Sequence, residues 1–235
     1  MLAELCTTQV PFADDLIRNI PGIRVSQALF DDLAEAPADQ EVAIAAEALG
    51  RIPSAAPTIT RPFDYGTVIA YSFDAAHWQA TRFSDGLRYG VWYGSLELET
   101  TIHETVFHAH RFIADSYPEL DRDVVRERRV FDVRCDALLV DLRGREAAHP
   151  DLVARTSYAF TQALGRYLHE QGQNGLLVKS ARCDGTNAAV LNPQRLSNVR
   201  DKLFLTYRIN PARDRAVVER DLGRPWLTLA PSALY

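Results

Sequence analysis

The sequence predicts an α+β fold with a largely antiparallel β core and flanking helices. Short runs of β-branched and aromatic residues cluster in residues 67–95 and 129–209, without the regular alternation of strand and helix that a doubly wound sheet requires. Residues 96–113 and 157–171 instead carry apolar side chains at helical spacing. These patterns favour an antiparallel sheet with a few helices packed against it.

Residues 1–60 are predicted to form a helical N-terminal lead-in. Apolar residues recur at helical spacing in residues 23–33, and an alanine-rich run follows at residues 41–49. Prolines 53, 57 and 62 then interrupt any regular element. We expect residues 61–235 to form the second part of the chain, and the two parts to make one compact unit.

Strands are expected at residues 68–73 and 90–93, where short aromatic and β-branched runs are flanked by glycine or polar residues. Residues 96–113 form an amphipathic helix, with an apolar stripe made by Leu98, Ile102, Val106, Ala109 and Phe112. Four polar residues lie off that stripe and align along the helix as a ridge: Glu97, Thr101, Glu104 and His108.

The remaining elements follow from the same two periodicities. Residues 129–135 alternate between apolar and charged side chains, as in a half-buried antiparallel strand, and residues 137–142 supply another strand. A helix covers residues 157–171 and ends before Gly172. Further strands are expected at residues 176–178, 188–191 and 202–209, and near residues 226–227.

Composition is that of an ordinary globular chain. The 235 residues are 47% hydrophobic and 24% charged, and the formal net charge of −5 argues against non-specific binding to nucleic acid. No stretch of about 18 apolar residues occurs, and the N-terminus lacks a signal-peptide pattern. We therefore expect a cytoplasmic protein that binds no membrane.

The three cysteines, Cys6, Cys135 and Cys183, are far apart and form no CxxC motif. They offer no basis for a disulfide framework or a structural zinc site, so we expect reduced thiols. Lys179 and Lys202 are the only lysines, and every other basic residue is arginine. Arginine grips phosphate and carboxylate with two hydrogen bonds, but a GC-rich genome would give the same bias, so composition leaves the ligand open.

Several familiar motifs are absent. His103 and Glu104 suggest a zinc protease, but the next histidine, His108, is five residues from His103 where HExxH requires four. His108 and His110 are therefore expected to pack against neighbours or face solvent. The chain contains no GxGxxG, GxxxxGK[ST] or GxSxG sequence. The sequence therefore gives no support for a dinucleotide-binding fold, a P-loop protein or a hydrolase with a nucleophile elbow.

A different set of residues carries a resemblance to a known family. Arg82 and Phe83 begin a run that continues through Tyr93-Gly94-Ser95 to Glu104 and His108, and this run resembles the core of the RES domain, named for its Arg, Glu and Ser. Residues 175–182, together with Gly185 and residues 189–193, resemble a later family segment. Residues 24–27 and 61–65 resemble two upstream stretches. The likeness covers residues 20–195.

The resemblance implies an ADP-ribosyltransferase-like fold and a catalytic domain over residues 61–235. It implies a toxin of a toxin–antitoxin pair that consumes NAD+ by phosphorolysis or hydrolysis, or by transferring ADP-ribose to a protein. NAD+ is then a substrate rather than a prosthetic group, phosphate is a possible co-substrate, and no metal is expected. The expected partner is a cognate antitoxin related to helix-turn-helix regulators of the Xre type.

The resemblance also suggests roles for particular residues. Cleavage of the N-glycosidic bond places positive charge on the ribose, which Glu104 would stabilise from a rigid helix. Arg82 and Arg24 would bind the pyrophosphate, Tyr93 would offer its ring to nicotinamide, and Ser180 would offer a hydroxyl to the amide or ribose.

Without the resemblance, the same residues have ordinary structural explanations. Glu104 would be a solvated helix carboxylate, Arg82 a surface arginine and Tyr93 a core aromatic residue. The alternative function is a non-catalytic module that keeps the scaffold to bind a nucleotide or a protein. Loss of NAD+ during incubation with the purified chain would favour the enzyme, and binding without loss would favour the module.

Overall fold

The computed structural model describes residues 2–22 and 65–235, which belong to one compact unit. Eight strands form its sheet in the order β1-β2-β5-β4-β3-β6-β7-β8, with a further pairing of β1 with β3. Their bounds are β1 Gln9–Pro21, β2 Trp92–Ser95, β3 Val124–Asp141, β4 Gly175–Lys179, β5 Thr186–Val190, β6 Leu196–Asn210, β7 Arg215–Asp221 and β8 Arg224–Leu229. Every pairing is antiparallel except that of β3 with β4. The predicted α+β class with a largely antiparallel core is confirmed.

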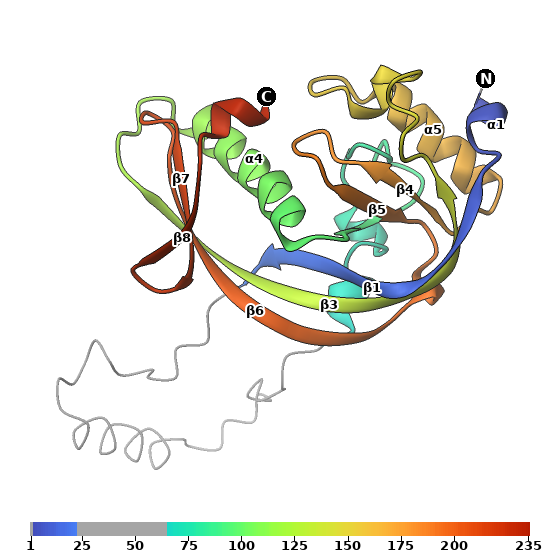
Figure 1. Cartoon of the computed structure of the whole chain (residues 1–235), viewed down its shortest axis with the longest axis horizontal. Helices are drawn as coiled ribbons and strands as arrows, with labels where there is room; N and C mark the ends of the chain where they lie inside the picture. The colour runs from blue at the N-terminus through green and yellow to red at the C-terminus, as the bar shows by residue number, and fades with distance from the viewer. Residues whose placement is uncertain (1, 23–64) are drawn as a thin grey trace, which may run out of the picture. The chain divides into compact units, whose positions relative to one another are not determined.

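The pairings close a circuit of five strands, because β1 binds both β2 and β3 while β5 and β4 complete the path between them. β1 and β2 meet only at the pair Ile17 and Ser95. Strands β6, β7 and β8 extend the sheet from the other edge of β3. Figure 1 shows β1, β3 and β6 as long curved strands, with α4 on one side of them.

The helices are α1 Leu2–Leu5, α3 Thr67–Ala70, α4 Leu98–Ser116 and α5 Ala159–Glu170, with short 3₁₀ turns at Ala75–His77, Pro150–Val153, Pro193–Arg195 and Pro231–Leu234. Helices α4 and α5 confirm the two predicted amphipathic segments. The stripe of α4 differs at its end, because Phe112 is 56% exposed while Phe107 and Ile113 are buried. At 3.6 residues per turn two neighbouring positions compete for the buried face, and packing selects between them.

The prediction of a helical lead-in over residues 1–60 is wrong for residues 9–21. These residues form β1, which pairs with β3 from Gln9 and Val140 to Pro21 and Arg128. A partner more than a hundred residues away determines this structure, and local periodicity does not report such a partner. Residues 2–22 belong with residues 65–235 in one compact unit. Residues 23–64 lie outside the described part of the chain.

Three other elements differ from expectation. Residues 67–70 form helix α3 rather than a strand, with Val68 buried and its carbonyl accepting a hydrogen bond of 3.0 Å from Trp92 Nε1. The two strands expected at residues 129–135 and 137–142 are one continuous strand, β3. Strand β7 was not predicted at all, although Ala216 and Val218 show its alternating burial.

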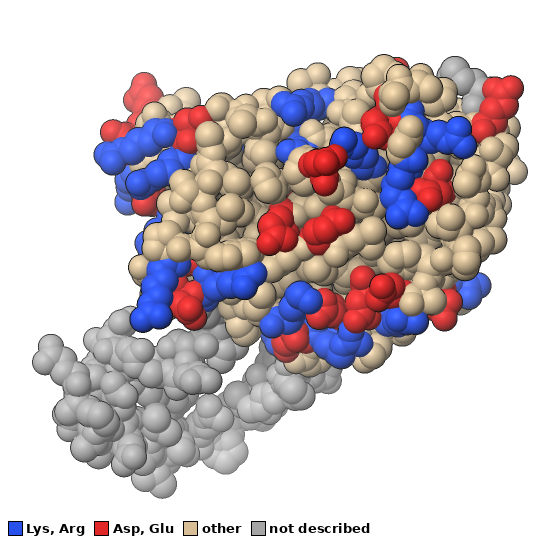
Figure 2. Space-filling view, in the orientation of Figure 1, with Lys and Arg blue, Asp and Glu red and all other residues tan. Residues whose placement is uncertain are grey.

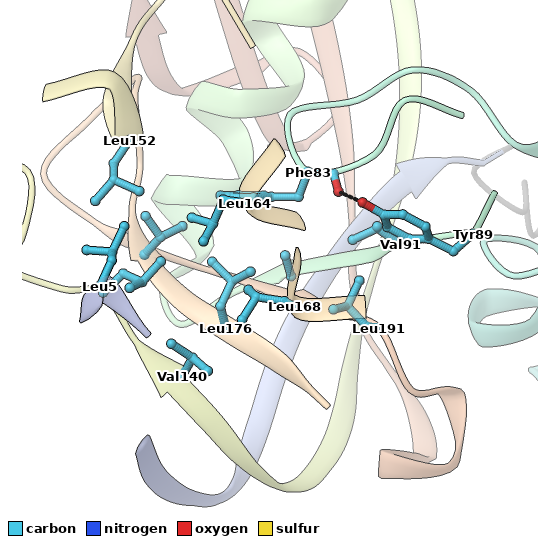
Figure 3. Close-up of a cluster of buried hydrophobic side chains, with 13 residues drawn as sticks. Leu5, Phe83, Tyr89, Val91, Val140, Leu152, Leu164, Leu168, Leu176 and Leu191 are labelled. Carbon is cyan, nitrogen blue, oxygen red and sulfur yellow. Dashed lines mark hydrogen bonds between the residues drawn. The ribbon is translucent and has the colours of Figure 1, made fainter. Parts of the chain in front are cut away.

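Buried side chains form a cluster beneath α5 that holds the 83–91 segment against the sheet (Figure 3). The Tyr89 hydroxyl donates a hydrogen bond of 2.7 Å to the Phe83 carbonyl within this cluster. Gly165 lets α5 approach closely, because a Cβ there would lie 2.0 Å from Phe83 O. This packing positions Arg82, the residue before Phe83, at the wall of the cavity described below.

Acidic and basic side chains are interspersed on the visible face in Figure 2. Among the described helices, none has the length and apolar character needed to span a membrane.

Candidate active site

A cavity of about 330 Å³ lies where β1, β2 and β5 meet α4 and the 79–82 segment. Three of the four residues in the predicted polar ridge of α4, Thr101, Glu104 and His108, line it. The fourth, Glu97, instead accepts hydrogen bonds from Thr100 Oγ1 at 2.8 Å and Thr186 N at 3.0 Å. One face of α4 therefore presents a carboxylate to the cavity, while its first turn is tied to the start of β5.

Glu104 is held by two hydrogen bonds to the same oxygen. Ser180 Oγ and Asn187 Nδ2 each donate to Glu104 Oε1 at 2.7 Å. Among the described residues no hydrogen bond reaches Oε2. The carboxylate is thus fixed in orientation through one oxygen and leaves the other for a ligand.

The two donors are themselves positioned by the sheet. Asn187 lies opposite Ser95 in the pairing of β5 with β2, and Ser95 Oγ donates to Asn187 Oδ1 at 2.6 Å. This contact directs the Asn187 amide group toward Glu104. Ser180 follows β4, where its own N–H donates to Gly185 O at 2.7 Å and its hydroxyl oxygen accepts from Arg182 N at 3.0 Å.

Arg82 lines the cavity on the side formed by the 79–82 segment. Its Nη1 donates to Ala154 O at 2.9 Å and more weakly to Leu152 O at 3.4 Å, and its guanidinium lies 4.7 Å from the centre of the Tyr158 ring. No carboxylate among the described residues pairs with it. Its Nε and Nη2 make no hydrogen bond in residues 2–22 and 65–235, so they are available to an anion.

Arg18 of β1 is a second cation at the cavity, and sequence analysis did not identify it. It donates to the Tyr93 carbonyl and to Ser72 Oγ, its Nε is buried with no hydrogen-bond partner, and no described carboxylate pairs with it. Burial lowers the pKa of Arg18 to about 10, and nearby Arg128 acts in the same direction. A charge left in this state is costly unless an anionic ligand compensates it.

Tyr93 lines the cavity, and its hydroxyl is hydrogen-bonded to the 81–83 segment. The hydroxyl shares a hydrogen bond of 2.8 Å with Thr81 Oγ1 and accepts one of 3.0 Å from Phe83 N. Burial raises the pKa of Tyr93 to about 12, so the hydroxyl is neutral at physiological pH. The residue offers a neutral aromatic surface.

His108 closes the ridge near Glu104. His108 is an exposed residue, and partial desolvation of its ring lowers its pKa, with Glu104 opposing this shift and Arg182 and Arg82 adding to it. His108 is therefore neutral at pH 7 and can donate or accept one hydrogen bond at the cavity.

A comparison of the sequence with models of known protein families identifies the family of this chain. The family model described as the RES domain matches residues 48–210, which is more than half of the 235-residue chain. The chain belongs to the RES domain family. No curated protein sequence matches this RES domain.

One similar solved chain comes from the crystal structure of the M. tuberculosis MbcT-MbcA toxin-antitoxin complex. It shares 14% sequence identity and a TM-score of 0.48 with this RES domain, over 90% of the present chain and 93% of that chain.

The structure places some of the predicted site residues of this RES domain at the cavity and leaves one of them outside the described residues. Glu104 and Ser180, 76 positions apart in sequence, are joined by a hydrogen bond, and Arg82 and Tyr93 line the same cavity as Glu104. Arg24 lies outside the described residues. No group of three or more potential metal ligands occurs within residues 2–22 and 65–235.

Sequence analysis missed Arg18 and Asn187 in this RES domain for separate reasons. Arg18 lies in a segment that was expected to be helical, so its place on a central strand was not visible. Asn187 lies one residue before the expected strand 188–191. A polar residue at the start of a buried strand, beside a segment already matched to the family, was the available signal.

Proposed function

We propose that the chain is an enzyme that cleaves the nicotinamide–ribose bond of NAD+. Membership in the RES family supports an activity of this kind, and the arrangement of Glu104 is the single observation that carries the proposal. A carboxylate fixed by Ser180 and Asn187 at a cavity wall suits a reaction in which positive charge develops near it.

In the proposed step, the bond between ribose C1′ and the nicotinamide nitrogen breaks, and its electron pair leaves with nicotinamide. The ribose becomes oxocarbenium-like, and the Glu104 carboxylate stabilises this charge or orients the 2′-hydroxyl. A nucleophile then bonds to C1′, and any proton on its attacking atom passes to solvent. Water gives ADP-ribose, phosphate gives a phosphorylated ADP-ribose, and a protein side chain gives an ADP-ribosylated protein.

The arginines at the cavity account for the charged half of the substrate. Arg18 and Arg82 both line the cavity and neither has a described carboxylate partner, so a diphosphate would supply the missing anion. We keep Arg24 in this role as a proposal from the family resemblance. The Tyr93 ring would contact nicotinamide, because its hydroxyl is already engaged by Thr81 and Phe83.

The size of the cavity limits how much of the NAD+ molecule it can hold. A volume of about 330 Å³ lies at the lower end of the range for small-molecule sites. We therefore place the nicotinamide and its ribose inside the cavity, with the remainder of the dinucleotide extending out of it.

We further propose that the chain is the toxin of a toxin–antitoxin pair and acts in the cytoplasm. An enzyme that depletes NAD+ has to be restrained in the cell that makes it. The restraint we propose is an antitoxin related to helix-turn-helix regulators, which inserts an acidic group beside Arg82.

The direct test incubates purified chain with NAD+, with and without inorganic phosphate, and identifies products by mass. We expect catalytic loss of NAD+ with release of nicotinamide. In Glu104→Gln, which keeps the shape of the side chain and removes its charge, turnover should fall by about a hundredfold or more.

Thermal unfolding of both proteins controls for the fold, and Glu99→Gln, at an exposed position in the first turn of α4, is the matched control. Near-normal turnover in a folded Glu104→Gln protein would remove Glu104 from the mechanism. Stoichiometric NAD+ binding without loss would support the non-catalytic module instead.

A further inference from the structure

Two arginines of β3 lie beside the cavity, on the face of the sheet that carries α4. Arg128 contacts the cavity-lining residue Asn19, because its Nε donates to Asn19 Oδ1 at 2.9 Å and its Nη2 donates to Asn19 O at 2.8 Å. Arg126 lies two residues earlier on β3, so both side chains leave the strand on the same face. Tyr207 of β6 lies opposite Arg126, its ring is 5.8 Å from the Arg128 guanidinium, and its hydroxyl is hydrogen-bonded to α4.

Together with Arg18 of the cavity, these residues form a group that we call the arginine strip: Arg18, Arg128 and Arg126. None of the three has an ion pair with a carboxylate in the part of the chain that the structure describes. Burial lowers the pKa of Arg18 and of Arg128, and in each case the next arginine of the strip lowers it further. Neighbouring cations without counter-ions favour an anionic ligand that follows the strip.

Phe112 borders the arginine strip from the side of α4. Thr105, His108 and Phe112 are spaced at i, i+3 and i+7, so they share one face of the helix, and the first two line the cavity. Phe112 is 56% exposed, although its position in the apolar stripe predicted burial, and its ring centre lies 5.7 Å from the Arg126 guanidinium. An exposed aromatic ring beside an arginine is a surface on which a nucleotide base stacks.

The position of Phe112 suits the part of NAD+ that the cavity does not hold. Phe112 is eight residues beyond Glu104 on α4, which is about 12 Å along the helix axis at 1.5 Å per residue. The cavity of about 330 Å³ holds the nicotinamide and its ribose in the proposed function. The diphosphate and the second ribose would then extend from Glu104 past the arginine strip, which brings the adenine to Phe112.

We propose that Phe112 and Arg126 form the adenine subsite of this enzyme, in which the adenine ring of NAD+ stacks on the Phe112 ring beside the Arg126 guanidinium. The identity of the dinucleotide rests on the proposed function. Phe112 and Arg126 are binding residues only, because they lie one turn or more beyond the residues that line the cavity. They act on affinity for the adenosine half and leave the breaking bond to Glu104.

The first experiment titrates 5′-AMP into the purified full chain by isothermal calorimetry. This probe carries the adenine and lacks the nicotinamide, so its binding is independent of turnover. Phe112→Ala should weaken AMP binding by about tenfold, the scale of one lost stacking partner, and Phe112→Trp should retain it. Leu222→Ala, at a 60% exposed position between β7 and β8, is the matched control and should bind AMP like the unmodified chain.

AMP affinity that is unchanged in a folded Phe112→Ala protein would overturn the proposal, as would an unmodified chain that does not bind AMP. Arg126→Gln should weaken AMP binding by about two- to fivefold, the value of an exposed cation–π contact. Arg213→Gln removes an exposed arginine that pairs with Asp121, and it should have no effect.

Photolabelling determines where the base binds. The chain is irradiated with 8-azido-AMP, and peptide mass mapping locates the label. We expect it in the second half of α4 or in the first residues of β3, with protection by excess NAD+. Label confined to other peptides would show that adenine binds elsewhere.

A kinetic experiment tests the subsite in the reaction itself, and this arm alone requires that the chain consumes NAD+. Nicotinamide mononucleotide has the same scissile bond and lacks the adenosine half. The ratio of kcat/KM for NAD+ to kcat/KM for the mononucleotide should fall about tenfold in Phe112→Ala and stay constant in Leu222→Ala. A constant ratio in Phe112→Ala would refute the subsite. A chain that consumes neither compound would refute the proposed function, and AMP binding would still decide whether Phe112 holds adenine.

Discussion

Arg18 is a half-buried cation without a described counter-ion. Its Nε has no hydrogen-bond partner, and its other donors reach only the Tyr93 carbonyl and Ser72 Oγ. Such a residue costs stability in the free protein and gains its compensation when an anion binds. The same reasoning applies more weakly to Arg82, which rests on backbone carbonyls and the Tyr158 ring.

We predict that Arg18→Gln raises the KM for NAD+ by about ten- to a hundredfold, the value of one charge-assisted contact of roughly 1.5–3 kcal/mol. The kcat should change less, because the diphosphate is charged in both the ground and the transition state. Arg82→Ala should behave in the same way. Steady-state kinetics on folded variants measures both constants.

Arg213→Gln is the matched control, since Arg213 pairs with Asp121 at 3.3 Å and does not line the cavity. A KM for NAD+ that is the same in Arg18→Gln and Arg213→Gln would show that Arg18 is a structural residue only.

At the scale of elements, the contact of α5 with the 82–83 segment decides where the wall of the cavity lies. Gly165 makes this contact possible, because its missing side chain leaves room for the Phe83 carbonyl. Buried Leu164 and Leu168 then pack on the sheet from the same helix. A small residue that does not itself line the cavity thus helps to position Arg82.

We predict that Gly165→Ala destabilises the chain, although alanine is the better helix former by about 1 kcal/mol. A Cβ would lie 2.0 Å from Phe83 O, so the helix or the segment has to move. Overpacking of this kind costs about 1–3 kcal/mol, which lowers the melting temperature by roughly 2–12 °C in a chain of this size. Differential scanning calorimetry measures the change.

The control for this helix is Ala163→Ser, at an exposed position two residues earlier. An increase in the melting temperature of Gly165→Ala, as helix propensity alone would give, would mean that α5 does not approach Phe83 as closely as described.

At the scale of the whole molecule, a chain with a net charge of −5 places two uncompensated arginines in one cavity. Acidic and basic side chains are interspersed on the visible face of the molecule (Figure 2). An anionic group is therefore favoured at the cavity while the rest of the molecule gives polyanions little attraction. The proposed substrate and the proposed antitoxin segment are both anionic, so both would bind at the positively charged cavity.

We predict that expression of the chain alone lowers cellular NAD+ and arrests growth, while co-expression with the proposed antitoxin restores both. The purified complex should fail to bind NAD+, because the partner's acidic group and the diphosphate compete for Arg82. Extraction of NAD+ pools over time and titration of NAD+ into the complex provide the measurements. Expression of Glu104→Gln separates loss of NAD+ from a general burden of expression.

Unchanged NAD+ pools in cells that contain soluble, folded chain would rule out the toxin function. A complex that binds NAD+ as tightly as the free chain would contradict competition at the cavity and place the partner elsewhere.

Local periodicity in the sequence alone was enough to predict several strands and helices of this protein and part of its candidate site. Alternation in residues 129–135 and the stripe of α4 follow from which side chains prefer water, and a strand or helix repeats that preference at period 2 or 3.6. The same argument put Thr101, Glu104 and His108 on one ridge, and all three line the cavity. The family resemblance added Arg82, Tyr93 and Ser180.

Tertiary structure decided what depends on distant partners. Residues 9–21 became a strand because β3 pairs with them, and this pairing brought Arg18 to the cavity. Asn187 reached Glu104 only because β5 lies beside β2, where Ser95 orients its amide. Hydrogen bonds between strands join residues with no fixed spacing in the chain, so their formation depends on the folded sheet and leaves no periodic signal in the sequence.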